Sequence, residues 1–415
     1  MHKESSHWAV LAGRDFRLYF IGYATSLLGS AMAPVALVFA ILNAGGTASQ
    51  TGGIMAATIL PIVLFLPWGG VVADRLGSRR VMMAADVLRC MAQATLAAAV
   101  GFGHPALWTF LVLAALRGTG EGFFTPGLTA LVPRLVIDPL LPAANASMSV
   151  ARSAATVAGP ATAGLLVATC GPAVALFVDA ATYAVSVLVL ALIRLSPQPT
   201  VPRNRVLSDL REGWLYFRST TWLWVMTLQF SMFNLLVTSP FYVLGPVVAE
   251  RRFGGAAAWG TTMALYGTGA VIGGLFMLRR TFARPLVAAT ITGACWALPN
   301  AALGLSLKLT WVAGAALLAG VGMAISGTLT TTMTQRHVPP AVLARISSFN
   351  YFGSYALGPL GLIAAGPVAA AVGIAPVLLV SAAWQAFASA CVLIIPQIRH
   401  LPSESTAKPV SETVA

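Results

Sequence analysis

Charged side chains are scarce in this chain. Only 9% of its 415 residues are Asp, Glu, Lys or Arg, whereas 58% are hydrophobic and the mean hydropathy is +0.82. Soluble globular domains carry about 25% charged residues, because their surface must face water. The composition therefore excludes a water-soluble globular protein and indicates a chain that lies mostly in lipid.

Residues that bind metals or perform catalysis are also few. The four cysteines lie far apart and have no metal-binding spacing, and the five histidines fall at the termini or in predicted loops. The sequence contains no Walker-type phosphate loop, so direct use of ATP is not expected. We therefore expect no metal, no cofactor and no enzymatic activity, because a membrane enzyme would need a catalytic set that the sequence lacks.

Long apolar segments, broken by short polar turns, fill almost the whole chain. A helix needs about 20 apolar residues to cross a bilayer core of about 30 Å. The runs lack the alternation of a membrane β-barrel, so they predict helices. The twelve predicted segments are Phe16–Leu42, Thr51–Ala73, Val81–Val100, Ala106–Val132, Ala144–Ala168, Ala173–Ile193, Trp222–Val248, Ala256–Leu278, Pro285–Leu307, Thr310–Thr334, Ile346–Ala371 and Ala375–Ile395.

The basic residues are distributed unevenly between the two sides of this twelve-helix arrangement. The net charge is +13, but on one side the loops hold only Arg251, Arg252 and Lys308. Loops rich in Lys and Arg remain in the cytoplasm, so both termini are predicted to lie there. The placement argues against nucleic-acid binding, which would need a basic soluble domain. We expect a multi-pass protein of the cytoplasmic (inner) membrane whose partners are the lipid bilayer, protons and a small molecule, and which is a monomer.

The polar stretch in the middle divides the apolar segments into six and six. The predicted domains are an N-terminal bundle (1–195), a cytoplasmic linker (196–221), a C-terminal bundle (222–400) and a disordered cytoplasmic tail (401–415). Residues 209–217 of the linker predict a short amphipathic helix on the membrane surface. A weak repeat supports the division, because Gly159-Pro160 in the fifth segment is matched by Gly358-Pro359 in the eleventh. Duplicated six-helix halves are typical of transporters.

The turn between the second and third segments carries the sharpest motif. Glycines allow close helix approach and a tight turn, and an acidic residue lies among several arginines. The pattern closely resembles the loop signature of the major facilitator superfamily. Its residues are Gly70, Asp74, Arg75, Gly77, Arg79 and Arg80.

Ionisable residues inside the predicted spans lie in the first half. Arg117 and Glu121 are four residues apart in the fourth segment, so they share a helix face, and Asp179 lies in the sixth segment. Intramembrane charges are costly and usually functional. The superfamily has an Arg-led motif in the fourth helix that is linked to proton coupling. We assign proton transfer to Glu121, with Arg117 beside it and Asp179 as the second candidate; alternatively, Glu121 only neutralises Arg117.

The fifth segment contains Gly159-Pro160 and Gly164. These residues resemble part of the fifth-helix signature of antiporters in the superfamily, and they predict a kinked helix that packs closely. The alternative is an ordinary kink without a role in coupling.

The second half offers neutral polar and aromatic side chains inside its spans. Such groups suit a large, mostly uncharged ligand, although each could instead form an interhelical hydrogen bond. The predicted substrate-binding residues are Gln229, Asn234, Tyr266, Asn300, Asn350, Tyr351 and Tyr355, and Gln385 is a further neutral polar side chain of this kind.

Together, the twelve spans and these motifs resemble the major facilitator superfamily over the whole chain, and most of all its branch of macrolide-efflux proteins and the enterobactin exporter. The resemblance implies an all-α fold of two six-helix bundles. It also implies secondary active export of a drug, siderophore or other natural product by proton antiport. Two alternatives stay open: an uptake symporter for a small nutrient or lysolipid, and a membrane sensor without transport.

Overall fold

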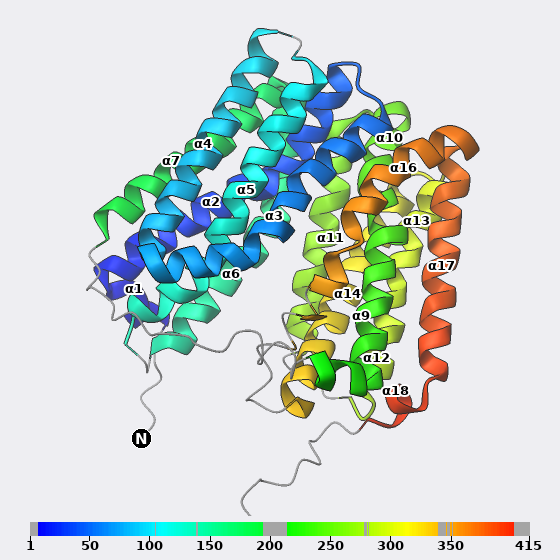
Figure 1. Cartoon of the computed structure of the whole chain (residues 1–415). Coiled ribbons are helices and arrows are strands. Elements are labelled where there is room, and N and C mark those ends of the chain that lie inside the picture. The colour runs from blue at the N-terminus through cyan, green and yellow to red at the C-terminus, as the bar shows by residue number, and fades with distance from the viewer. Residues whose placement is uncertain are drawn as a thin grey trace, which may run out of the picture. The chain divides into compact units, whose positions relative to one another are not determined.

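A computed structural model describes residues 7–103, 105–137, 140–193, 214–277, 280, 282–338, 346, 349–350 and 352–401 of the chain. Throughout these residues the backbone forms helices and turns, with no strand. The helices up to residue 193 are α1 (His7–Ala12), α2 (Arg14–Asn43), α3 (Ala48–Leu76), α4 (Ser78–Phe102), α5 (Leu107–Leu131), η1 (Val132–Arg134), α6 (Leu141–Cys170) and α7 (Pro172–Leu192) (Figure 1).

The later helices include two short irregular stretches. The element η3 is a π-helical turn and η4 is a 3-10 turn, and each continues a neighbouring α-helix. The elements are α9 (Thr221–Phe233), η3 (Asn234–Thr238), α10 (Ser239–Arg252), α11 (Ala256–Met277), α12 (Pro285–Gly293), η4 (Ala294–Trp296), α13 (Ala297–Gly304), α14 (Leu309–His337), α16 (Gly358–Val372), α17 (Ile374–Ile394) and α18 (Pro396–His400).

The lengths of these helices agree with the membrane-spanning prediction. Ten of them, within the described residues, are long and apolar enough to cross a bilayer. The two other predicted segments, Ala106–Val132 and Ala256–Leu278, correspond to α5 and α11, which have 25 and 22 residues. Of the predicted amphipathic helix, residues 214–217 are helical and residues 209–213 lie outside the described part.

Contacts between Cα atoms divide the chain into two compact units. Unit 1 comprises Met1–Pro202, Tyr242–Gly267 and Pro359–Gly373, and unit 2 comprises Arg203–Phe241, Thr268–Gly358 and Ile374–Ala415. Each unit is described by itself below.

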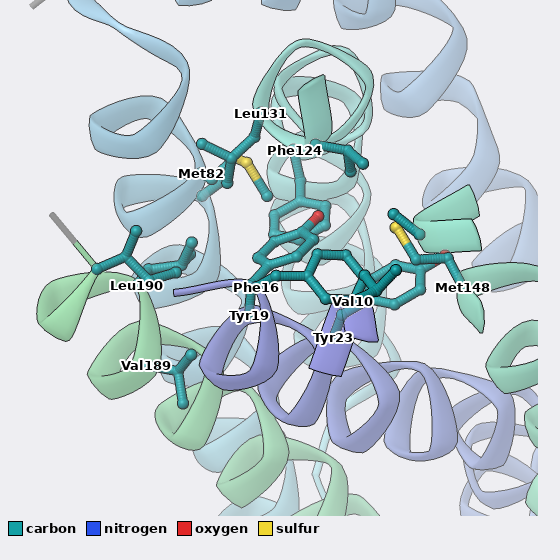
Figure 2. Packing of buried hydrophobic residues seen from close by; sticks show 14 of the residues in the cluster. Val10, Phe16, Tyr19, Tyr23, Met82, Phe124, Leu131, Met148, Val189 and Leu190 are labelled. Carbon is teal, nitrogen blue, oxygen red and sulfur yellow. The ribbon is translucent and has the colours of Figure 1, made fainter. Parts of the chain in front are cut away.

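A cluster of buried aromatic and aliphatic side chains lies near one end of the first helices in unit 1 (Figure 2). Phe16, Tyr19 and Tyr23 recur at helical spacing on α2, so they share the face that meets Met82 and Leu190. The two tyrosine rings are stacked with their centroids 6.0 Å apart. This cluster holds the ends of α2, α4 and α7 together.

Glycines allow close helix approach inside unit 1. A Cβ atom on Gly164 of α6 would lie 2.9 Å from the Ala256 carbonyl oxygen and 3.0 Å from Gly260 Cα, both in α11. On α5, a Cβ on Gly118 would collide with the carbonyl of Thr58 in α3. Since lipid supplies no hydrophobic force between helices, such close van der Waals packing stabilises their association.

Candidate transport site

Arg89 of α4 lies at the centre of a buried ionic network in unit 1. Its side chain forms ion pairs with Asp86 of the same helix and, at 2.5 Å, with Glu121 of α5. The Ser186 hydroxyl of α7 donates to Asp86 Oδ2 at 2.6 Å. The guanidinium carbon also lies 4.2 Å from the ring centroid of Phe124 and 4.4 Å from that of Tyr183. The network therefore ties α4, α5 and α7 together.

A second, looser ion pair connects α5 and α7. Arg117 Nε lies 3.8 Å from Asp179 Oδ2, and Asp179 is fully buried. Neither carboxylate oxygen of Asp179 accepts a hydrogen bond from the described residues, and Arg117 Nε donates none to them. A buried charge without hydrogen-bond partners costs free energy, and binding a proton would remove that cost for Asp179.

Glu121 and Arg117 form no ion pair with each other within 4.0 Å. The two residues share α5, but Glu121 pairs with Arg89, and Arg117 pairs with Asp179. Spacing on one helix showed which side chains are neighbours, whereas the helices packed against α5 decided their ionic partners.

A small cavity of about 100 Å³ lies beside Arg117. Thr58 of α3 and Gln93 of α4 contribute polar groups to a lining that is otherwise mostly apolar. The cavity therefore separates the Arg117 side chain from close packing on one side.

The Gly70–Arg80 turn is anchored to the end of α7. Gly77, between α3 and α4, has φ of 87°, a conformation that favours glycine. Arg79 Nε donates to the Leu190 carbonyl at 2.6 Å, and Nη2 donates to the Ala191 carbonyl at 2.7 Å. Arg79 thereby satisfies terminal carbonyls of α7 that have no partner within the helix. The side chains of Asp74 and Arg75 lie outside the described part, as do the surroundings of Gly70.

The fifth-segment motif contacts two different helices of unit 1. A Cβ on Gly159 would collide with Ala31 of α2, whereas Gly164 faces α11. Pro160 lies between them inside α6. The motif therefore occupies a point where three helices meet closely.

Unit 2 contains a cavity of about 300 Å³ among α9, α12, α14, α17 and the segment before α16. Its lining includes no Asp, Glu, Lys, Arg or His among the described residues. The predicted residues Gln229, Asn350 and Tyr355 line it. The Phe230 and Tyr355 rings meet edge to face with centroids 5.7 Å apart, which gives the wall an aromatic surface.

Several polar residues at this cavity were missing from the predicted binding set. They are Ser326, Thr330 and Thr331 of α14. Gln385 of α17, one of the neutral polar residues noted in the second half, also lines the cavity. The hydroxyl-rich run from Thr328 to Thr334 is the sequence feature from which the polar face of α14 could have been predicted. The Gln385 amide donates to the Gly293 carbonyl at 3.0 Å, where α12 ends.

Other predicted binding residues lie elsewhere. Asn300 is fully buried and donates to the Trp296 carbonyl at 3.3 Å. Asn234 donates to the carbonyls of Phe230 at 3.0 Å and Ser354 at 3.2 Å, so it joins helices. Tyr266 lines a cavity of about 220 Å³ in unit 1, and Tyr351 lies outside the described residues.

Where the structure describes the chain, no group of three His, Cys, Asp or Glu side chains could hold a metal ion. The candidate site comprises an uncharged, mostly apolar cavity with several polar groups in unit 2, and buried ion pairs in unit 1.

Comparison with known proteins identifies the family. The model of a family described as transmembrane secretion effector matches residues 5–413. The chain belongs to this family. The multidrug efflux pump Tap of Mycobacterium tuberculosis is 27% identical over 410 residues, covering 92% of this chain and 94% of Tap. Macrolide efflux protein A of Streptococcus pyogenes is 23% identical over 266 residues, covering 63% of this chain and 65% of that protein.

Solved structures show the same fold. A POT family transporter in complex with 5-aminolevulinic acid has a TM-score of 0.73 at 14% identity, covering 93% of this chain and 97% of that one. A bacterial homologue of the lysosomal transporter Spinster has a TM-score of 0.69 at 15% identity, covering 95% and 98%.

This member of the transmembrane secretion effector family is thus a multi-pass transporter of the efflux branch of the major facilitator superfamily, and it is not an enzyme. The resemblance inferred from the motifs and the all-α membrane fold are confirmed.

Proposed function

We propose that this secretion effector exports mostly uncharged, amphipathic natural products or drugs across the cytoplasmic membrane in exchange for protons. The observation that carries the proposal is that the ion pairs and the uncharged cavity lie in different units. The ion pairs found among the described residues lie in unit 1, whereas the cavity of about 300 Å³ in unit 2 has no charged lining residue among them.

The cavity in unit 2 suits the cargo. Amides of Gln229 and Gln385 and hydroxyls of α14 supply hydrogen bonds, and Phe230 and Tyr355 supply aromatic surface. Pockets of this kind bind ligands through apolar contact, with a few polar groups that fix orientation. The relatives named as multidrug and macrolide efflux proteins support a cargo of this class.

The Arg117–Asp179 pair is our candidate for the coupling site. When Asp179 binds a proton it loses its charge, and its attraction to Arg117 on α5 ends. The two helices could then move relative to each other, and loss of the proton on the other side would restore the pair. Glu121 is less free to exchange protons, because its ion pair with Arg89 is shorter (2.5 Å, against 3.8 Å for Arg117–Asp179).

Reconstituted vesicles test this assignment with erythromycin as cargo. We expect Asp179→Asn to exchange erythromycin down its gradient, but to lose accumulation driven by a pH gradient. Glu121→Gln is the matched variant and should keep part of the driven accumulation. Wild-type accumulation by Asp179→Asn would exclude Asp179 as the carrier, and loss in Glu121→Gln alone would return the role to Glu121.

A second experiment tests the cavity. Gln229→Ala and Tyr355→Ala should raise the KM for erythromycin about tenfold, the effect of losing roughly 1.4 kcal/mol of binding, while proton leak stays unchanged. Phe387→Ala, on an exposed face of α17, serves as the control. If all three variants keep the wild-type KM, the cargo binds elsewhere.

The same vesicles separate the alternatives. An uptake symporter would accumulate cargo with the proton flow rather than against it. A membrane sensor would bind cargo without any flux.

A further inference from the structure

A polar stripe runs along one face of α6 in unit 1. Asn145, Ser149, Arg152 and Thr156 recur at helical spacing, and all four are exposed. Arg152 lies nine positions after Ala143, where the apolar span begins, which is a depth of about 13 Å at 1.5 Å per residue. An arginine at that depth is costly against lipid, so the stripe must face a water-filled space.

A cavity of about 390 Å³ adjoins this stripe within unit 1. One wall is apolar and one is polar, and the polar wall contains the cation. The lining residues are Leu128, Val132, Leu141, Met148, Asn145, Ser149 and Arg152.

The Arg152 guanidinium is held by a hydrogen bond and forms no ion pair within 4.0 Å among the described residues. Nη2 donates to the Tyr23 hydroxyl at 2.9 Å, and Tyr23 is buried in the aromatic cluster of α2 (Figure 2). Arg89 of α4 and Arg117 of α5 have carboxylate partners, whereas Arg152 forms no ion pair with a carboxylate among the described residues. A guanidinium has five N–H donors, so most of those on Arg152 remain available.

We propose that this cavity is an anion subsite, in which Arg152 binds the carboxylate of an amphipathic organic acid. The planar guanidinium matches a carboxylate with two parallel hydrogen bonds. Ser149 and Asn145 add neutral donors, while Leu128 and Val132 contact the apolar body of the ligand. The inference deepens the proposed function, on which it rests, because it adds acids to the exported compounds.

Calorimetric titration of the purified full-length protein in detergent tests the subsite without transport. The probes are 2-naphthoate and its neutral analogue 2-naphthamide. We expect Arg152→Gln to weaken naphthoate binding at least about tenfold, as loss of a charge-assisted hydrogen bond predicts. Arg152→Lys should be intermediate, and naphthamide affinity should be the same in all proteins. Arg251→Gln, which removes an exposed arginine at the end of α10, is the control.

Three results would overturn the subsite: no measurable naphthoate binding to the wild type, equal affinity for the acid and the amide, or unchanged naphthoate binding in Arg152→Gln. Should Arg152→Gln fail to fold, Ser149→Ala replaces it, with an expected loss of about threefold for a neutral hydrogen bond.

Vesicle export separates this inference from the proposed function. A protein that prefers naphthoate through Arg152 but exports no erythromycin under a pH gradient would contradict the proposed function alone. If Arg152→Gln reduces export of naphthoate and erythromycin equally, Arg152 acts in coupling, and the subsite is wrong.

Discussion

Arg89 is among the most enclosed charges in unit 1, with 1% of its surface exposed. Two carboxylates and two aromatic rings surround it, so the cost of removing this guanidinium from water is offset by direct contacts. Removing one partner of such a group leaves an uncompensated buried charge. We therefore expect the Arg89 network to stabilise the packing of its helices, whereas the loosely paired Asp179 is the candidate for proton binding.

Arg79 permits a sharper prediction, because a charged side chain at a helix C-terminus stabilises the helix through its dipole and terminal carbonyls. We expect Arg79→Gln to lower the free energy of unfolding by about 1 kcal/mol, since both hydrogen bonds to α7 are lost. Thermal unfolding in detergent measures the change. Arg80→Gln removes the adjacent, exposed arginine and should melt as the wild type does. Equal melting of both variants and the wild type would show that the contact with α7 contributes nothing.

At the scale of elements, two interruptions of the helices were not predicted. The π turn η3 begins at Asn234, whose amide donates to the Ser354 carbonyl. The 3-10 turn η4 follows Gly293, whose carbonyl accepts from Gln385. Each irregular turn is joined to a distant segment by a side-chain-to-backbone hydrogen bond, and hydropathy along the chain contains no information on such contacts.

Close packing of α6 on α11 leads to another prediction. Gly164→Ala places a methyl group 2.9 Å from the Ala256 carbonyl, which forces the helices apart inside unit 1. Overpacking of this kind costs about 1–3 kcal/mol, so the melting temperature and export should both fall. Gly53→Ala is the matched control: its Cβ meets nothing within 4 Å, and alanine favours a helix. A Gly164→Ala protein as stable as Gly53→Ala would mean that the contact is not tight.

At the scale of the whole molecule, the orientation in the membrane remains a prediction from loop charge. Single cysteines at Asn43 and Ser405, in a cysteine-free background, report it through an impermeant thiol reagent. Asn43 is exposed at the end of α2, whereas a Cβ at the nearby Gly46 would lie 2.7 Å from the Ile41 carbonyl oxygen. On intact cells we expect labelling at Asn43 but not at Ser405. The opposite pattern would invert the topology.

The sequence by itself determined that the chain lies in a lipid bilayer, that it is helical, and that it belongs to the major facilitator superfamily. Apolar runs of about 20 residues form helices in lipid, because a helix satisfies all backbone hydrogen bonds within the segment. The Gly70–Arg80 signature is a continuous stretch of sequence, so it can be recognised without the structure. Only the tertiary structure decided which charges meet. Arg117 and Glu121 are neighbours on α5, yet their partners, Asp179 and Arg89, come from α7 and α4, because packing between helices selects contacts that spacing within one helix cannot specify. Packing between helices also decided which predicted binding residues reach a cavity. Gln229 and Tyr355 line one, whereas Asn300 is buried between helices.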